Sequence, residues 1–168
     1  MKNIKKQSLR HTSGQAGFTL IEILVVIGII AILAAVVIVA LNPARQFAQA
    51  RNTQRWSNVN TILNAVTQRM ADARGVWRHA GGTGNSLDAT CPDDLPVAAT
   101  SIGALAANID LAPCIVPTYV STMVMDPSVG SLDNIGYTIE RSAGTNGRIT
   151  VAVPVANQEL GEVISVTR

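Results

Sequence analysis

Residues 17–41 read GFTLIEILVVIGIIAILAAVVIVAL, and this apolar stretch decides the fold class. Between Phe18 and Leu41 the only charged residue is Glu22. About 20 apolar residues in a helix span the hydrocarbon core of a bilayer, so the stretch predicts a transmembrane helix. The alternative is a buried helix of a soluble protein. The stretch offers no polar face to water, which favours the membrane.

The segment before the span, residues 1–17, is polar and basic. It carries Lys2, Lys5, Lys6 and Arg10 and no acid, so its net charge is +4. It resembles the start of a secretory signal, but such a signal has a shorter apolar core closed by a small-residue cleavage site. The positive-inside rule predicts that this leader stays in the cytoplasm and that the chain beyond the span faces outward.

A second helical pattern follows Asn42-Pro43, a pair that kinks a helix or starts a new one. Apolar residues recur on one face, and we expect that face to be buried: Val59, Ile62, Leu63, Val66, Met70 and Ala73. The opposite face is polar: Asn58, Asn60, Thr61, Asn64, Gln68 and Asp72. Gly75 is suited to end the helix. We therefore expect one helix of about 55 residues, half in lipid and half amphipathic.

The rest of the chain predicts a small head. Residues 79–134 are rich in glycine and proline, with short helical turns expected at 102–108 and 117–123. Strand-like runs follow at 136–140, 148–153 and 161–167, with a turn cluster at 143–147. Such runs indicate an antiparallel meander. The fold class is therefore α+β: a long N-terminal helix whose outer half packs on a small C-terminal antiparallel β-sheet.

Charge and cysteine usage add two expectations. Residues 42–78 have a net charge of +5 and residues 79–168 a net charge of −6, so a basic stalk precedes an acidic head. The stalk arginines either form a solvated face or meet acidic heads of neighbouring chains. Cys91 and Cys114 both follow the span, and an even pair on an exported segment predicts a disulfide. The alternative is two separate buried thiols.

The sequence gives little support for an enzyme, a metal-binding protein or a nucleic-acid-binding protein. Beyond residue 17 the chain has one histidine, His79, and no lysine, so we assign no catalytic residue. Asp88, Asp93, Asp94 and Asp110 could meet a cation, but no calcium loop is legible, and we expect no metal or cofactor. Aromatic residues make up only 4% of the chain, so no direct nucleic-acid binding is predicted. Trp56 and Trp77 are expected to pack where the stalk meets the head.

The junction Gly17-Phe18-Thr19-Leu20-Ile21-Glu22, between a basic leader and an apolar helix, resembles the processing signal of type IV prepilins and type II secretion pseudopilins. The resemblance is close for residues 14–41, looser to Gly75, and does not cover the head. It implies cleavage after Gly17 by a prepilin peptidase and N-methylation of Phe18 by the same enzyme. A glycine lacks Cβ, which lets the catalytic groups approach the scissile bond.

Glu22 is the one charged residue of the span. Placing an ionisable group in a membrane helix costs a few kcal/mol, so such a residue is by default a functional one. The resemblance implies that its partner is the amine of Phe18, in the same or an adjacent subunit. Such a pair is strong at low dielectric and could set the axial register of an assembly. The alternative is a carboxylate that snorkels to the headgroups, which suits the subunit before assembly.

These observations predict four segments: a leader (1–17), a transmembrane and assembly helix (18–41), an amphipathic stalk helix (42–75) and a head (76–168). The resemblance implies a pilin-like structural subunit of a type IV pilus or related filament. The subunit would be stored in the cytoplasmic membrane with its head outside, then assembled at the cell surface or in the periplasm.

Its implied partners are the peptidase/methyltransferase, the inner membrane, copies of itself or related pilins, and an assembly platform with its motor. Two alternatives remain. One is a type II secretion or DNA-uptake pseudopilin. The other is a single-pass anchored binding protein that never polymerises.

Overall fold

The computed structural model describes residues 17–73, 75, 77, 91–92, 94–143 and 147–168. The chain divides into two compact units, the first ending at Asn42 and the second running from Pro43 to Arg168. Each unit is described by itself below.

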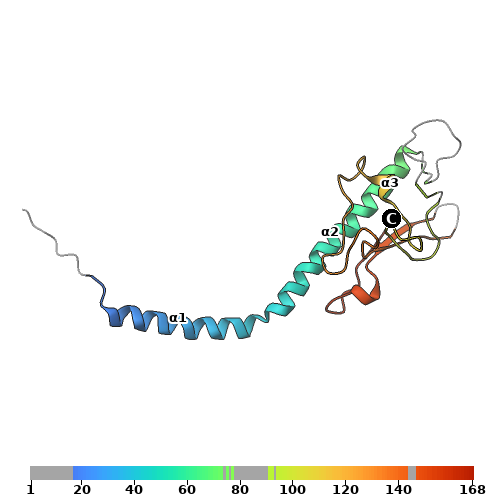
Figure 1. The fold of residues 1–168 in the computed structure, drawn as a ribbon. Helices are drawn as coiled ribbons and strands as arrows, with labels where there is room; N and C mark the ends of the chain where they lie inside the picture. The colour runs from blue at the N-terminus through green and yellow to red at the C-terminus, as the bar shows by residue number, and fades with distance from the viewer. Residues whose placement is uncertain (1–16, 74, 76, 78–90, 93, 144–146) are drawn as a thin grey trace, which may run out of the picture. The chain divides into compact units, whose positions relative to one another are not determined.

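The first unit is built on α1, Leu20–Leu41, drawn in blue in Figure 1. Its residues are apolar all round, and none of them is buried. At 1.5 Å per residue its 22 residues extend about 33 Å, close to the thickness of a hydrocarbon core of about 30 Å. It is long and apolar enough to cross a membrane.

A one-residue break follows, so the structure differs from the single helix of about 55 residues that the sequence predicted. Asn42 adopts a left-handed conformation with φ 42°, and Pro43 begins the next helix. Proline disfavours helical geometry at the residue before it, and asparagine tolerates the left-handed region better than most residues. Proline at a first helical position is well placed, because that position needs no N–H donor.

The second unit begins with α2, Pro43–Asp72. The predicted apolar face is confirmed at Val59, Ile62, Leu63 and Val66, which are all fully buried. Gly75 lies just beyond the helix with φ 86°, and its N–H donates to the carbonyl of Met70 at 2.7 Å. A positive φ at this place is the usual stop for a helix.

The predicted polar face of α2 is wrong at Asn58. This side chain is buried, and its Nδ2 donates to the Met125 carbonyl and to the Tyr137 hydroxyl, both at 2.9 Å. Periodicity sorts residues by type alone, whereas a polar side chain can be buried when later segments supply its hydrogen-bond partners.

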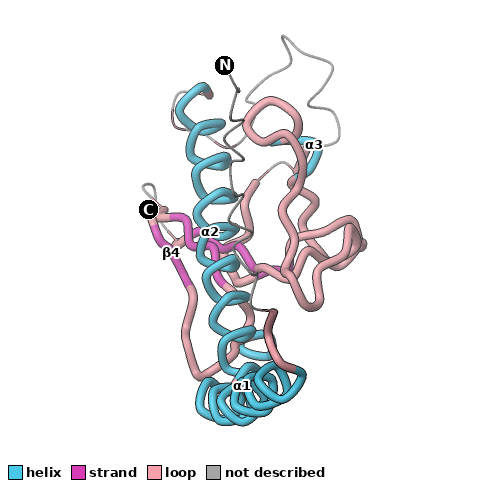
Figure 2. Tube along the Cα trace, turned by 90° about the vertical axis from the view of Figure 1, so that its left-hand side faces the viewer, coloured by secondary structure: helices cyan, strands magenta, loops and turns pink. Residues whose placement is uncertain are grey.

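The sheet has four short antiparallel strands in the order β1-β2-β3-β4. They are β1 Thr100–Ser101, β2 Thr138–Arg141, β3 Ile149–Ala152 and β4 Ser165–Thr167. The predicted runs correspond to β2, β3 and β4, and β2 pairs with β3 from Thr138↔Ala152 to Arg141↔Ile149. Figure 2 shows α2 running across the sheet, and α2 contacts both β3 and β4. The α+β class, with a small C-terminal antiparallel sheet, is confirmed.

The irregular part of the head departs from prediction in four places. Residues 102–108 and 117–123 form turns and bends instead of helical turns. The one-turn helix α3, Ala112–Ile115, was not predicted, and neither was β1. Elements of two to four residues are too short to show a period. The middle of the predicted 143–147 turn lies outside the described residues.

One core joins α2, the sheet and α3. It combines the apolar face of α2 with side chains from every strand region, among them Trp77, Ile102, Leu111, Ile115, Ile135, Tyr137, Ile139, Ile149, Val151 and Ile164. The core of the head is therefore formed by side chains of the second unit itself.

Candidate processing and assembly site

The residues that carry the predicted chemistry, Gly17 to Glu22, form the start of α1. Thr19 is the N-cap: the N–H of Glu22 donates to its Oγ1 at 3.3 Å and to its carbonyl at 3.1 Å. The first N–H groups of a helix have no partner inside the helix, and a threonine cap satisfies one of them. The helix therefore starts one residue after Thr19 and places Glu22 in its first turn.

Thr19 was not singled out from the sequence, although a signal for it exists. The run Thr19-Leu20-Ile21-Glu22 has the spacing of a capping box, in which a threonine is followed three residues later by a glutamate. A carboxylate in the first turn also interacts favourably with the positive end of the helix dipole. Glu22 is thus compatible with the helix itself.

Gly17 has no steric role in this chain. A Cβ built on Gly17 meets no atom within 4 Å, and its φ lies outside the left-handed region. The fold therefore does not require glycine here, and a requirement for a bare Cα would have to come from an external partner.

The surface of α1 is unsatisfied in the isolated chain. Its large apolar side chains are between 47 and 84% exposed, and Phe18, just before the helix, is 78% exposed. Fully burying one such side chain contributes about 1.5–3 kcal/mol, so the helix as a whole gains tens of kcal/mol in lipid or among other helices.

Residues 12–38 match a family model described as the prokaryotic N-terminal methylation motif. The chain carries a prepilin-type motif. It is the motif of type IV pilin and pseudopilin precursors, and it covers the end of the leader and most of α1. No curated protein and no solved structure matches the chain.

The motif supports a type IV pilin-like or pseudopilin precursor and indicates a structural protein. It implies processing by a prepilin peptidase and assembly with pilin subunits at the membrane. Together with the single apolar helix near the N-terminus it is consistent with a single-pass membrane anchor.

A second polar cluster, unexpected from the sequence, lies on α2. Arg51, Asn52, Arg55 and Trp56 bind carboxylates of later segments, and we call these four residues the carboxylate clamp. The expectation that the stalk arginines are solvated or reserved for neighbours is wrong for Arg51, Arg55 and Arg69. All three bind groups of their own head.

The deepest clamp contact is between Arg55 and Asp126, whose side chains are 1% and 0% exposed. Arg55 Nε donates to Asp126 Oδ2 at 2.7 Å. Burial alone would raise the pKa of Asp126, but the hydrogen bonds from Arg55 and from the N–H groups of Ser128 and Val129 outweigh it and lower that pKa. In return the hydrogen bond that Arg55 donates to Asp126 raises the pKa of Arg55. The pair is therefore ionised and fully hydrogen-bonded.

The other clamp contacts hold the connection between β3 and β4. Arg51 Nε donates to Glu159 Oε1 at 2.9 Å, and Trp56 Nε1 donates to Glu162 Oε1 at 2.7 Å. Asn52 Nδ2 donates to the Glu159 carbonyl and to Glu162 Oε2. These hydrogen bonds lower the pKa values of Glu159 and Glu162 below the usual value for glutamate.

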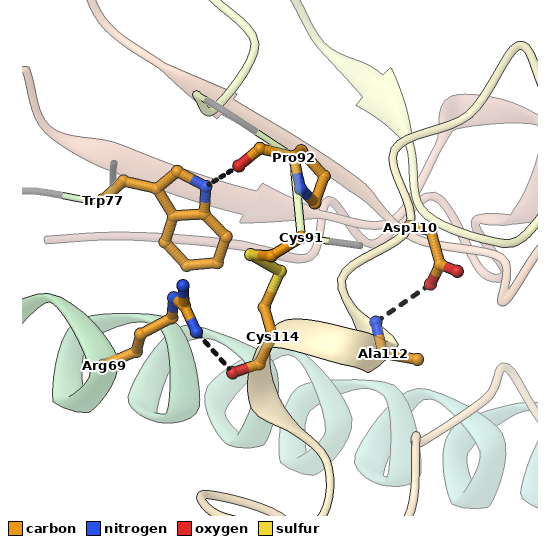
Figure 3. Close-up of a disulfide and its surroundings, with 7 residues drawn as sticks. All are labelled: Arg69, Trp77, Cys91, Pro92, Asp110, Ala112 and Cys114. Carbon is orange, nitrogen blue, oxygen red and sulfur yellow. Dashed lines mark hydrogen bonds between the residues drawn. A yellow bond between two sulfur atoms is a disulfide. The ribbon is translucent and has the colours of Figure 1, made fainter. Parts of the chain in front are cut away.

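At the other end of α2 the structure joins Cys91 to Cys114 by a disulfide (Figure 3). The Arg69 guanidinium lies over the Trp77 ring, 4.9 Å from its centre, and donates to the Cys114 carbonyl at 2.9 Å. Trp77 Nε1 donates to the Pro92 carbonyl at 3.1 Å. Trp77 and Arg69 therefore tie both halves of the disulfide to the end of α2.

The residues considered for other chemistry are placed as follows. Within the described parts of the chain no group of three or more His, Cys, Asp or Glu side chains is arranged to hold a metal ion. Asp94 pairs with Arg141 at 2.9 Å, and Asp110 Oδ1 accepts the N–H of Ala112. His79, Asp88 and Asp93 lie outside the described residues.

Proposed function

We propose that the chain is the subunit of a type IV pilus or pilus-like filament, cut after Gly17 and N-methylated at Phe18. The observation that carries the proposal is a prepilin-type motif on a helix that buries none of its residues. Such a helix needs lipid before assembly and neighbouring helices after it. The same apolar surface serves both states.

Cleavage after Gly17 would free the Phe18 amine four residues before Glu22. Phe18 precedes the N-cap Thr19, so the helix does not hold this amine beside its own Glu22. In the water-poor centre of a filament, an unpaired Glu22 would be costly and a paired one strongly favoured. Pairing with the amine of an adjacent subunit therefore fixes how far one helix can slide along the next.

Imaging of cells that express the chain tests this function. We expect filaments that bind antibody raised against residues 80–168. Glu22→Val should insert and be trimmed normally but should lose most of the filament, whereas Glu22→Asp, which keeps the charge, should retain part of it. Short periplasmic filaments recovered only from cell envelopes would identify a pseudopilus. Antibody confined to the membrane, with no filament under any condition, would support the non-polymerising anchor and refute the proposal.

A further inference from the structure

The tip of the β3–β4 connection has an unusual composition for an exposed turn. Leu160 and Gly161 both have positive φ, 58° and 70°, and the N–H of Glu162 donates to the Glu159 carbonyl to close the turn. Glycine adopts this geometry freely, but leucine is strained in it. Leu160 is nevertheless 54% exposed, so the strain does not serve to bury it.

Two further aliphatic side chains of the same connection are exposed, Val155 and Val163. We call Val155, Leu160 and Val163 the apolar tip. The clamp fixes this tip, because Glu159 and Glu162 bracket Leu160 and are both bound to α2. Glu159 is paired with Arg51, and the Glu162 carboxylate accepts hydrogen bonds from Asn52 and Trp56.

The apolar tip lies toward the end of the head where α2 begins. Figures 1 and 2 show the β3–β4 connection leaving the sheet and running back along α2 toward its N-terminal end. One helical turn before Arg51 on α2 is Phe47, whose side chain is 64% exposed. Phe47 and the β3–β4 connection thus supply exposed apolar side chains toward this end of the head.

We propose that the apolar tip and Phe47 contact the outer face of the membrane while the anchored subunit awaits assembly. The inference rests on the membrane-stored state of the proposed function. Arg51 lies about 12 Å along α2 from Pro43, which directly follows the break after the span. This separation along α2 is set by the covalent chain and holds for every angle between α1 and α2. The headgroup region itself extends several ångström outward from the hydrocarbon core.

The chemistry of the patch fits lipid. Phenylalanine and leucine side chains at the boundary of headgroups and acyl chains contribute apolar burial, as they do on interfacial helices. The ion pair with Arg51 offsets the charge of Glu159 beside the tip.

The test uses the full-length, uncleaved chain, one copy in each nanodisc of phosphatidylcholine and phosphatidylglycerol. A polarity-sensitive fluorophore is attached at Val163→Cys, since both native cysteines are in the disulfide. The matched control is Val97→Cys, which is equally exposed at 68%. Its neighbour Pro96 accepts the N–H of Arg141, away from the clamp. Lipids with a nitroxide headgroup should quench the label at 163 several-fold more than the label at 97.

A second variant separates contact from folding. Leu160→Asn removes the apolar side chain but tolerates positive φ, so the head should melt at the same or a higher temperature while quenching at 163 falls to the level at 97. Equal quenching at both labels, or quenching that Leu160→Asn leaves intact, overturns the proposal. If the label at 163 is shielded only in discs that hold two copies of the chain, the patch contacts a second subunit. That result also overturns the proposal. Neither cleavage nor polymerisation is needed, so the result is independent of the filament assay.

Discussion

The two long helices of this chain, α1 and α2, are adjacent in sequence but differ in how many of their residues are buried. The 22 residues of α1 bury nothing, whereas α2 buries ten of its 30 residues, including Asn52, Arg55, Asn58 and Arg69. α1 is uniform, so any apolar environment suits it. α2 carries specific polar groups that match specific partners in its own head. The comparison indicates that α1 is built for changing surroundings and α2 for one fixed fold.

The largest effect on the head should come from breaking the buried clamp pair. Asp126→Asn removes the charge that faces Arg55 and should destabilise the head by about 3–5 kcal/mol, because a buried guanidinium is left uncompensated. Thermal or urea unfolding of residues 43–168 measures it. Asp94→Asn is the matched control: Asp94 is about half exposed in its pair with Arg141, and its loss should cost under about 1 kcal/mol. Equal costs for the two variants would show that burial of the clamp does not matter.

Loss of the disulfide should come next. Reduction, or the double variant Cys91→Ser with Cys114→Ser, should cost the head about 3 kcal/mol by the chain-entropy relation for a loop of about 24 residues. The transition of α1 in lipid should not change, since both cysteines belong to the second unit. A free-thiol count of two in protein purified from the oxidising side of the membrane would refute the bridge.

Acid should destabilise the head. The folded-state pKa values of Asp126, Glu159 and Glu162 lie below their ordinary values of 3.8, 4.5 and 4.5. Unfolded carboxylates therefore bind protons before folded ones, and stability falls as the pH drops through about 4.5 and below. Melting temperatures measured from pH 6 to pH 3 should decline over that range. Asp126→Asn should have a shallower decline, and a steeper one would contradict the assignment.

The smallest effect is expected at the cap of α1. Thr19→Val should destabilise the first turn by about 1 kcal/mol because the N–H of Glu22 loses its side-chain acceptor. Thr19→Ser keeps the acceptor and serves as the control. Amide hydrogen exchange at Glu22 and Ile23 in nanodiscs should speed up in the valine variant alone. If both variants exchange like the original chain, the cap is not formed in lipid.

Elements with a recognisable sequence pattern were predicted. Side-chain contacts between segments that are distant in the chain were not. The apolar run of α1, the buried face of α2 and the three later strands all have a period or a length that can be recognised. The break at Asn42 was visible as Asn-Pro, but its outcome depends on whether the helix kinks or restarts. The head partners of Arg55 and Asn58, Asp126 and Met125, are more than 60 residues away in the chain, so no local pattern marks Arg55 and Asn58 as buried.

The candidate site divides in the same way. Gly17, Phe18 and Glu22 could be selected because they interrupt or border an otherwise uniform apolar run. Thr19 was not predicted as the cap, although the run Thr19 to Glu22 has capping-box spacing, because a cap is defined by where the helix begins and the apolar run has no visible start. The strained turn at Leu160 left no sequence signal beyond a single glycine after a leucine, because backbone strain becomes visible only in the folded chain.

The central claim is that α1 is the processed assembly helix of a pilus-type subunit, and the mass of the mature N-terminus tests it most directly. Protein extracted from membranes and filaments of cells with a prepilin peptidase should begin at N-methylated Phe18, and Gly17→Ala should be trimmed fully or more slowly. Gly17→Leu should keep its leader, because a bulky side chain blocks the scissile bond. A chain that retains residues 1–17, or a Gly17→Leu variant still trimmed to methylated Phe18, would contradict the account.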